Sequence, residues 1–361
     1  MLTALLYNTK THSLQPLDRD NLLASMPEPE QVEAKQSQHK GDVVTKAPPR
    51  CHVDEFMWVD VTDPSEDDLH LICQRFMVHP LVMEDIKARE DRPKLHDYEE
   101  YLYVIFHALR EVDKAEGAAN EEALAQRFGV ELSEIDCLVG SDYIVTIHTD
   151  TVKPFATLRD RWQQHPELMQ SGVGYLLYEL MDVVLDEYFP LLDSMDERID
   201  DFEDRLFTSF HGRLSSDIFA LKRSLLQIRR VAAPTRDVVN TLMRHNAENG
   251  GQQFAYFQDL YDHTVRIVDM IDTFRDILSG ALDAYLAVES NRMNSVMKTL
   301  TSASIILLIP TLIAGIYGMN FDNSPYNMPE LHARYGYPTV LGVMVVITIS
   351  LFIYFKRKSW L

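Results

Sequence analysis

Residues 294–320 read NSVMKTLTSASIILLIPTLIAGIYGMN, and this stretch decides how the rest of the chain is organised. From Thr299 to Phe321 no residue is charged. About 20 apolar residues, at roughly 1.5 Å rise each, span the roughly 30 Å hydrocarbon core of a bilayer. The stretch therefore predicts a transmembrane helix over residues 299–320.

One face of this helix is unusually rich in small or polar residues for contact with lipid. Its members recur at alternating steps of three and four, and we call them the polar stripe: Asn294, Met297, Thr301, Ser304, Leu308, Thr311 and Gly315. Polar groups at membrane depth usually face protein or water. The stripe indicates either a pore lining or a helix-packing seam of small residues. The polarity of Asn294, Thr311 and the closing Gly-Met-Asn favours the pore.

A second uncharged segment, residues 335–355, predicts another transmembrane helix. Lys356, Arg357 and Lys358 follow it at once, whereas the connecting loop, residues 321–334, has no basic excess. Positive charge next to a membrane segment marks the cytoplasmic side. We expect an external loop over 321–334, a basic cytosolic tail over 356–361, and both termini inside the cell.

The segment before the first span predicts a long stalk. Residues 252–309 contain no proline and one glycine. These 58 residues, at about 1.5 Å each, form a helix of roughly 87 Å, far longer than a bilayer is thick. We expect residues 252–298 to form a stalk that continues into the membrane.

Residues 1–170 predict a cytosolic α/β domain with helices on both faces of its sheet. Helix starts are indicated at Asp63-Pro64 and at His79-Pro80. Residues 25–50 are rich in Pro, Gln, Glu, Lys and Ser and are interpreted as a flexible loop. The expected strands cover residues 2–7, 13–17, 56–61, 101–110, 129–139 and 143–148, the last two joined as a hairpin at Gly140-Ser141-Asp142.

Residues 171–250 predict an acidic helical hairpin. A buried stripe is expected at Val184, Tyr188, Leu191, Met195, Ile199, Phe202 and Leu206. An opposing stripe consists of Asp182, Asp186, Asp193, Glu197, Asp200 and Asp204, which is either a solvated face or a surface that gathers divalent cations. A second helix covers 215–248, with a kink or break near Pro234, and Asn249-Gly250-Gly251 is expected to end it.

Charge and motif content narrow the function. The chain carries a formal charge of −21, and since the residues after Lys298 include two acids and four bases, the part up to Lys298 carries −23. This excess either serves solubility or attracts cations, and it disfavours nucleic acid as a partner.

Three dispersed cysteines indicate neither zinc nor disulfides, and the N-terminus lacks signal-peptide features. HExxH, GxSxG, P-loop and GxGxxG motifs are absent, so no enzyme is predicted.

Four C-terminal motifs identify the chain as a relative of the CorA family of magnesium transporters. They are Tyr317-Gly318-Met319-Asn320, MPEL at 328–331, Tyr335-Gly336-Tyr337-Pro338 and the final YFKRKSWL. The resemblance covers roughly residues 53–361. It implies a membrane protein with an α/β domain, a helical stalk and two transmembrane helices, assembled as a homopentamer in the cell's inner membrane. The transported ion would be Mg²⁺, with Co²⁺ or Ni²⁺ also passing.

The resemblance also assigns a selectivity filter, Gly318, Met319 and Asn320, at the outer end of a pore lined by the first helix. Mg²⁺ loses its water reluctantly. A ring of Asn320 amides would accept hydrogen bonds from that water without removing it. The competing interpretation is that Gly-Met-Asn is only a helix end and turn. Leu300 joins the polar stripe as a pore position, and Met297, Leu300 and Leu308 are either hydrophobic constrictions or ordinary packing.

Gating in the family uses carboxylates that bind intracellular Mg²⁺ at subunit boundaries and hold the ring closed. By resemblance the matching residues are Glu84, Asp85 and Asp259, with His263 and Asp182 as further candidates. Without the resemblance, Asp259 would be taken as a solvated acid on a helix.

Two other functions stay open from the sequence. One is a zinc transporter of the same superfamily, which the intact Tyr-Gly-Met-Asn motif disfavours. The other is a non-conducting, membrane-anchored cation sensor or scaffold, which the polar stripe disfavours. The link FDNSPYN between Asn320 and Met328 is longer than the family's usual link, so the geometry of the outer mouth is expected to differ.

Overall fold

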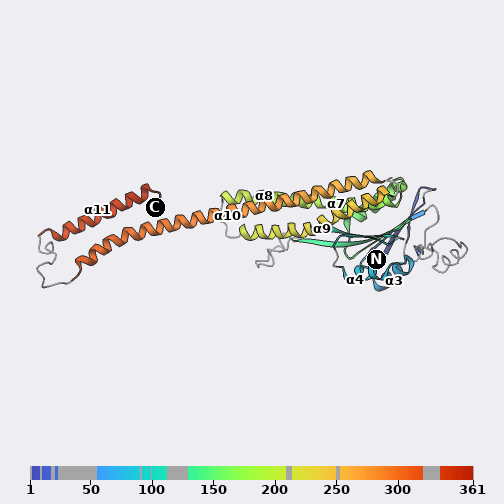
Figure 1. Ribbon diagram of the computed structural model, residues 1–361, viewed down its shortest axis with the longest axis horizontal. Helices are drawn as coiled ribbons and strands as arrows, with labels where there is room; N and C mark the ends of the chain where they lie inside the picture. Colours follow the sequence, from blue (N-terminus) through green and yellow to red (C-terminus); the bar gives the residue numbers. More distant parts are fainter. Residues whose placement is uncertain are drawn as a thin grey trace. The chain divides into compact units, whose positions relative to one another are not determined.

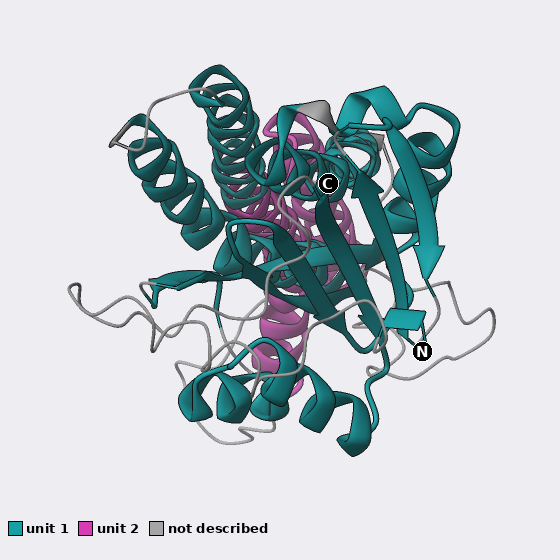
Figure 2. Ribbon diagram, turned by 90° about the vertical axis from the view of Figure 1, so that its right-hand side faces the viewer, with its two compact units in different colours: residues 1–279 teal, residues 280–361 magenta. Residues whose placement is uncertain are grey.

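The computed structural model (Figure 1) describes residues 2–8, 10–17, 21–22, 55–89, 92–98, 100–111, 129–208, 214–248, 253–319 and 334–360. The predicted loop 25–50, the helix end at Asn249-Gly250-Gly251, the filter residue Asn320 and loop residues 321–333 lie outside these ranges. The chain forms two compact units, Met1–Ser279 and Gly280–Leu361, which Figure 2 colours separately.

The first unit is built on a seven-stranded sheet in the order β2-β1-β3-β7-β6-β5-β4. Only β3 and β7 pair in parallel; the other neighbours are antiparallel. All six predicted strands are confirmed, while the four-residue edge strand β4 was missed because it is short and polar. The strands are β1 (Leu2–Asn8), β2 (Ser13–Leu17), β3 (Glu55–Thr62), β4 (Lys94–Asp97), β5 (Leu102–Glu111), β6 (Val130–Val139) and β7 (Tyr143–His148).

Helices α3 (Glu66–Arg75) and α4 (Pro80–Ala88) cover one face of the sheet. The helix start predicted at Asp63-Pro64 is wrong by two residues, because Ser65 is the N-cap and forms a capping box with Asp68. The start of α4 is confirmed, with His79 as the N-cap and Pro80 in the first turn.

The other face of the sheet contacts α7 (Val173–Asp186) and α9 (Leu214–Glu248). Helices therefore lie on both faces, as predicted. Helix α6 (Lys153–Gln164) and a 3-10 helix, Pro166–Ser171, precede α7 and were not predicted. Trp58 of β3 packs edge-on against Phe155 and Trp162 of α6, which brings α6 into the same core.

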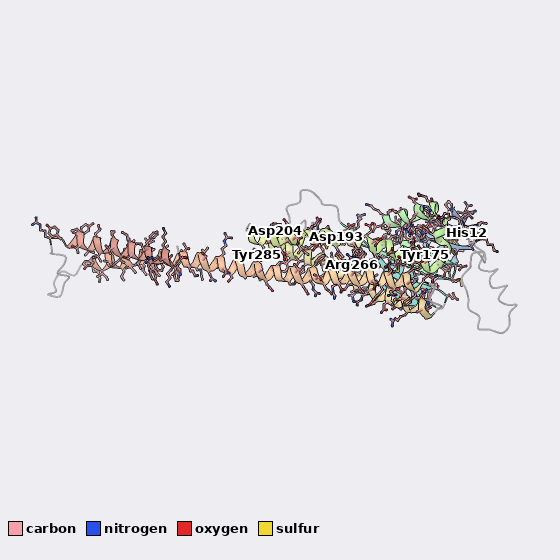
Figure 3. All side chains as sticks on the ribbon, turned by 90° about the horizontal axis from the view of Figure 1, so that it is seen from above. His12, Tyr175, Asp193, Asp204, Arg266 and Tyr285 are labelled. Carbon is pink, nitrogen blue, oxygen red and sulfur yellow. The ribbon has the colours of Figure 1, made fainter. Side chains whose placement is uncertain are left out.

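The acidic segment forms two helices where one continuous stripe was expected. Helix α7 ends at Asp186 and α8 (Tyr188–Thr208) begins two residues later. Pro190 has no N–H to donate to the carbonyl of Asp186, which explains a break at this point. The predicted apolar stripe is nevertheless buried from Val184 to Phe202, with Leu206 half-buried. Asp193 and Asp204 of the acidic stripe, labelled in Figure 3, are exposed.

The break expected near Pro234 does not interrupt its helix, and a second proline, Pro310, also lies inside a helix. Helix α9 continues through Pro234, and α10 (Phe254–Tyr317, 64 residues) continues through Pro310 and ends eight residues beyond Ile309, the last residue of the proline-free run. Around Pro234 the buried side chains Val231, Val238 and Val239 hold α9 against its neighbours, which offsets the missing backbone hydrogen bond.

The second unit pairs the C-terminal part of α10 with α11 (Gly336–Arg357). Both helices are long and apolar enough to cross a membrane. The chain turns back after α11, where Ser359 adopts a left-handed conformation (φ 55°). The hydroxyl of Thr299 on α10 donates to the carbonyl of Trp360 at 3.1 Å; the Ser302 hydroxyl lies 3.4 Å from the same carbonyl but is closer to the Thr299 carbonyl of its own helix, at 2.9 Å.

Candidate functional site

Helices α7 and α10 bring together three predicted residues, Asp182, Asp259 and His263, which we call the carboxylate–histidine cluster. One ligand atom from each lies within 4.8 Å of the others. His263 Nδ1 is 3.4 Å from Asp182 Oδ1, and His263 Nε2 is 3.9 Å from Asp259 Oδ1. Asp259 and His263 are four residues apart on α10, so they share one face of that helix. The cluster depends on the folded packing of α7 on α10.

The carboxylate–histidine cluster is partly buried, which distinguishes it from a group of acids in solvent. The side chain of Asp182 is 23% exposed, that of His263 33%, and that of Asp259 56%. Asp182 Oδ1 and His263 Nδ1 are shielded from solvent and face each other without the geometry of a hydrogen bond. Burial, reinforced by the nearby Asp186 carboxylate, raises the pKa of Asp182 to about 6. Two poorly satisfied, inward-facing ligand atoms suit a site that a cation completes.

The chemistry of the three donors fits divalent cations of two kinds. Carboxylate oxygens are the preferred protein ligands of Mg²⁺, and an imidazole can accept a hydrogen bond from one of the waters that Mg²⁺ keeps. Imidazole also binds Co²⁺, Ni²⁺ and Zn²⁺ directly. The cluster can thus hold a hydrated hard ion or a transition metal.

Sequence reasoning missed one residue next to the cluster. The hydroxyl of Tyr178 on α7 donates to Asp259 Oδ2 at 3.3 Å. Burial and the neighbouring Asp182 and Asp259 carboxylates raise the pKa of Tyr178, so its hydroxyl stays protonated. Its spacing of four residues from Asp182 places both side chains on one face of α7, which was a signal available in the sequence.

Glu84 and Asp85 are not part of this cluster. They lie on α4, which covers the opposite face of the sheet from α7. Glu84 is exposed, and Asp85 pairs with Lys94 at 2.7 Å. Within one chain, α4 and α10 therefore present separate groups of carboxylates.

The polar stripe lies on a face of α10 that α11 leaves open. Each of its seven members is exposed, with Met297 at 56% and Leu308 at 65%, and the pore candidate Leu300 is exposed at 67%. Ser302, on the side of α10 toward Trp360, is completely buried. The stripe is not a packing seam between the two helices of this chain.

The stripe hydroxyls make hydrogen bonds within their own helix. Ser304 donates to the Leu300 carbonyl at 2.8 Å, and Thr311 donates to the Leu307 carbonyl at 2.7 Å. Because each proton is directed at the backbone, the oxygen lone pairs are left as acceptors. These positions offer hydrogen-bond acceptors to water.

Only part of the predicted filter lies in the described chain. Gly318 donates its backbone N–H to the Ala314 carbonyl at 2.9 Å, and Met319 donates to the Ile316 carbonyl at 3.3 Å. The first two filter residues thus close the end of α10. A Cβ on Gly318 would approach the Ala314 carbonyl oxygen at 3.1 Å, so a larger residue would press on the backbone.

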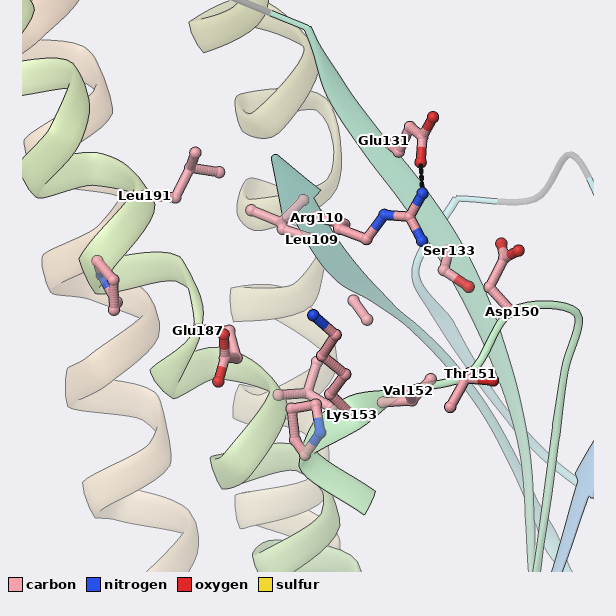
Figure 4. Close-up of a pocket in the computed structure, with 14 residues that line it drawn as sticks. Leu109, Arg110, Glu131, Ser133, Asp150, Thr151, Val152, Lys153, Glu187 and Leu191 are labelled. Carbon is pink, nitrogen blue, oxygen red and sulfur yellow. Dashed lines mark ion pairs between the residues drawn. The ribbon is translucent and has the colours of Figure 1, made fainter. Parts of the chain in front are cut away.

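A pocket of about 240 Å³ lies elsewhere in the first unit, where β5, β6, the start of α6 and the α7–α8 junction meet (Figure 4). An Arg110–Glu131 ion pair of 2.8 Å forms part of its rim, and Leu109, Val152 and Leu191 form an apolar lining. None of its lining residues is a predicted site residue, so the pocket is separate from the cluster.

A mixed α/β unit, two helices long and apolar enough to cross a bilayer, and a cluster of donors suited to a cation are the parts that a membrane protein handling divalent cations requires. Residues 53–357 match the family model of the CorA-like Mg²⁺ transporter protein. The chain belongs to the CorA family and is a divalent-cation transporter, which confirms the resemblance seen in the C-terminal motifs. Members of this family are transporters, not enzymes.

Relatives of known sequence and structure agree with this assignment. The chain is 36% identical over 304 residues to the "Putative metal ion transporter YfjQ" of Bacillus subtilis, covering 84% of this chain and 89% of the relative. It is 34% identical over 307 residues to the cobalt/magnesium transport protein CorA of Thermotoga maritima, covering 84% and 83%. The complete CorA magnesium transporter of Methanocaldococcus jannaschii has the same fold, with a TM-score of 0.74, 22% identity and coverage of 100% and 99%.

Proposed function

We propose that this protein is a channel-type transporter for Mg²⁺ that also passes Co²⁺ or Ni²⁺. The observation that carries the proposal is the polar stripe, which is exposed along the charge-free part of α10 on a face that α11 does not cover. Two helices cannot enclose a pore, so several copies must surround a common axis. We propose a homopentamer in the inner membrane, with spans at 299–320 and 335–355 and both termini in the cytoplasm.

The pore would act on a hydrated ion. Ser304 and Thr311 present acceptor lone pairs, because their protons are directed at carbonyls of their own helix. The waters around Mg²⁺ point their protons outward and need such acceptors. At the outer end, a ring formed by Gly318, Met319 and Asn320 would select the ion by the size and charge of its hydration shell. Exposed Met297, Leu300 and Leu308 would form hydrophobic constrictions in the same pore.

The membrane potential can drive uptake without ATP. Two positive charges that cross about 100 mV release about 4.6 kcal/mol. This energy corresponds to a concentration ratio above a thousandfold, since every 1.4 kcal/mol is tenfold.

Intracellular Mg²⁺ would gate this channel through the carboxylate–histidine cluster and α4. Asp182, Asp259 and His263 already converge in one chain. Glu84 and Asp85 lie on α4, across the sheet from α7, so a second copy would have to bring α4 to the cluster. Like charges that meet between copies repel when the site is empty and attract a shared cation when it is filled.

The proposal is tested by Mg²⁺ flux into liposomes that contain the purified full-length protein. We expect Asn320→Ala to abolish Mg²⁺ uptake while native mass spectrometry still shows five copies. Asn323→Ala is the matched control, an amide in the same external segment but outside the Gly-Met-Asn motif, and it should transport normally. Unchanged uptake by Asn320→Ala would contradict the filter role, and a monomer would contradict the pore.

The same assay distinguishes the two rival functions. Comparison of Mg²⁺, Co²⁺ and Zn²⁺ fluxes would identify a zinc transporter by a clear preference for Zn²⁺. A non-conducting sensor would bind Mg²⁺ without any flux. The exposed polar stripe favours conduction, because a membrane anchor needs only an apolar helix.

A further inference from the structure

The two oxygens of Asp259 face different partners. Oδ1 lies 3.9 Å from His263 Nε2, inside the carboxylate–histidine cluster. Oδ2 accepts the hydrogen bond from the Tyr178 hydroxyl. Asp259 is the most exposed member of the cluster, so without a partner its side chain would rotate among several conformers in solvent. The tyrosine is the described contact that restrains its second oxygen.

Tyr178 is itself held by a ring cluster that joins α7 to α10. Its ring lies 5.8 Å from that of Tyr175 and 5.2 Å from that of Tyr256, and Tyr175 and Tyr256 meet edge-on at 5.0 Å. Tyr175 and Tyr178 come from α7, while Tyr256 lies three residues before Asp259 on α10. The three rings fix the position of the Tyr178 hydroxyl.

A buried glutamate anchors this ring cluster to α6. Glu179 Oε1 accepts a hydrogen bond from the Tyr175 hydroxyl at 2.7 Å, and Glu179 Oε2 accepts from Trp162 Nε1 at 3.0 Å and from Arg161. Trp162 is 1% exposed and packs against Trp58 of the sheet. The residues that connect the sheet to Asp259 are therefore buried or packed ring against ring.

We propose that Tyr178 is a positioning residue of the cation site: its hydroxyl holds Asp259 Oδ2 so that Oδ1 points toward Asp182 and His263. The inference rests on the proposed sensor function and adds to it a residue that contacts no ion. Hydrogen-bonded partners of metal ligands typically contribute about 10–100-fold to metal affinity. Because Asp259 is half exposed, the lower end of that range is expected.

The experiment compares Tyr178→Phe with Tyr256→Phe in the full-length protein. Both changes keep the ring cluster, but only the first removes the hydroxyl that bonds Asp259. We expect Tyr178→Phe to raise the free Mg²⁺ that half-inhibits the current by about tenfold. Tyr256→Phe should inhibit like the native protein. Tyr178→Phe should have no further effect in an Asp259→Asn background, because the carboxylate that it orients is absent.

Two further measurements separate positioning from packing. Added Mg²⁺ should give a tyrosine difference spectrum that Tyr178→Phe loses and Tyr256→Phe keeps. The melting temperature in EDTA should be equal for all three proteins. If Tyr178→Phe lowers that temperature but leaves the inhibition curve unchanged, the positioning role is wrong.

The variants also distinguish this inference from the sensor proposal on which it rests. If Asp259→Asn shifts inhibition and Tyr178→Phe does not, the inference is overturned and the sensor stands. If Asp259→Asn has no effect on inhibition, both are overturned.

Discussion

Gly140 shows how one residue is constrained by a contact that only the fold creates. The turn Gly140-Ser141-Asp142 was predicted from its composition and joins β6 to β7 as expected. The structure adds that a Cβ at Gly140 would lie 2.2 Å from the ring of Tyr143. That ring is 2% exposed and packs against Phe76 with centroids 4.8 Å apart. Because it is packed in this way, the Tyr143 ring cannot move away from a Cβ added at Gly140.

We therefore expect Gly140→Ala to destabilise the first unit by about 1–3 kcal/mol through overpacking. The measurement is thermal unfolding of the full-length protein in detergent. Tyr143→Phe is the matched control: the buried Tyr143 hydroxyl has no hydrogen-bond partner among the residues that the structure describes, so its removal should leave stability unchanged or improved. Equal melting temperatures for Gly140→Ala and the native protein would show that the ring yields.

The positions at which the helices end do not follow from the positions of proline alone. Pro190 coincides with the break between α7 and α8, while Pro234 and Pro310 lie inside helices. The end of α11 is a Schellman motif, in which Ser359 donates to the Lys356 carbonyl and Trp360 donates to the Phe355 carbonyl. The rings of Trp360 and Phe355 stack at 5.6 Å and supply its usual apolar contact. This motif aims the Trp360 carbonyl at α10.

The hydrogen bond from Thr299 to that carbonyl should fasten the C-terminal turn to α10. We expect Thr299→Val to raise the rate of carboxypeptidase removal of Trp360 about fivefold, since one hydrogen bond contributes about 1 kcal/mol. Intact-mass measurement follows the digestion. Ser304→Ala is the control, because its hydroxyl bonds only its own helix, and it should be digested like the native protein. Equal rates for all three would disprove the fastening role.

At the scale of the whole molecule, the charge of the chain is concentrated before the membrane segments, where a cation sensor would operate. In the proposed ring, filling of the cluster between copies holds the pore closed. A substitution at Asp259 would be present in every copy of the ring. It would alter gating and leave the pore-lining residues unchanged.

We expect Asp259→Lys to raise the free Mg²⁺ needed to shut off the current, because it removes an oxygen ligand and places a positive charge beside Asp182 and His263. Asp269→Lys makes the same charge change on an exposed residue of the same helix and should leave the inhibition curve unchanged. Patch recordings with buffered Mg²⁺ on the cytosolic side provide the measurement. Identical curves for Asp259→Lys and the native protein would remove Asp259 from the sensor.

The sequence by itself determined the two membrane segments, the long helix, six of the seven strands of the sheet and the family. Runs of uncharged residues, alternation along strands and the Tyr-Gly-Met-Asn motif are local signals, which survive without knowledge of what packs against them. Only the tertiary structure decided that Asp182 meets Asp259 and His263, that Tyr178 bonds Asp259, and that α11 leaves the polar stripe open. These contacts join residues distant in the chain, and burial and side-chain direction depend on how helices pack rather than on spacing along the sequence.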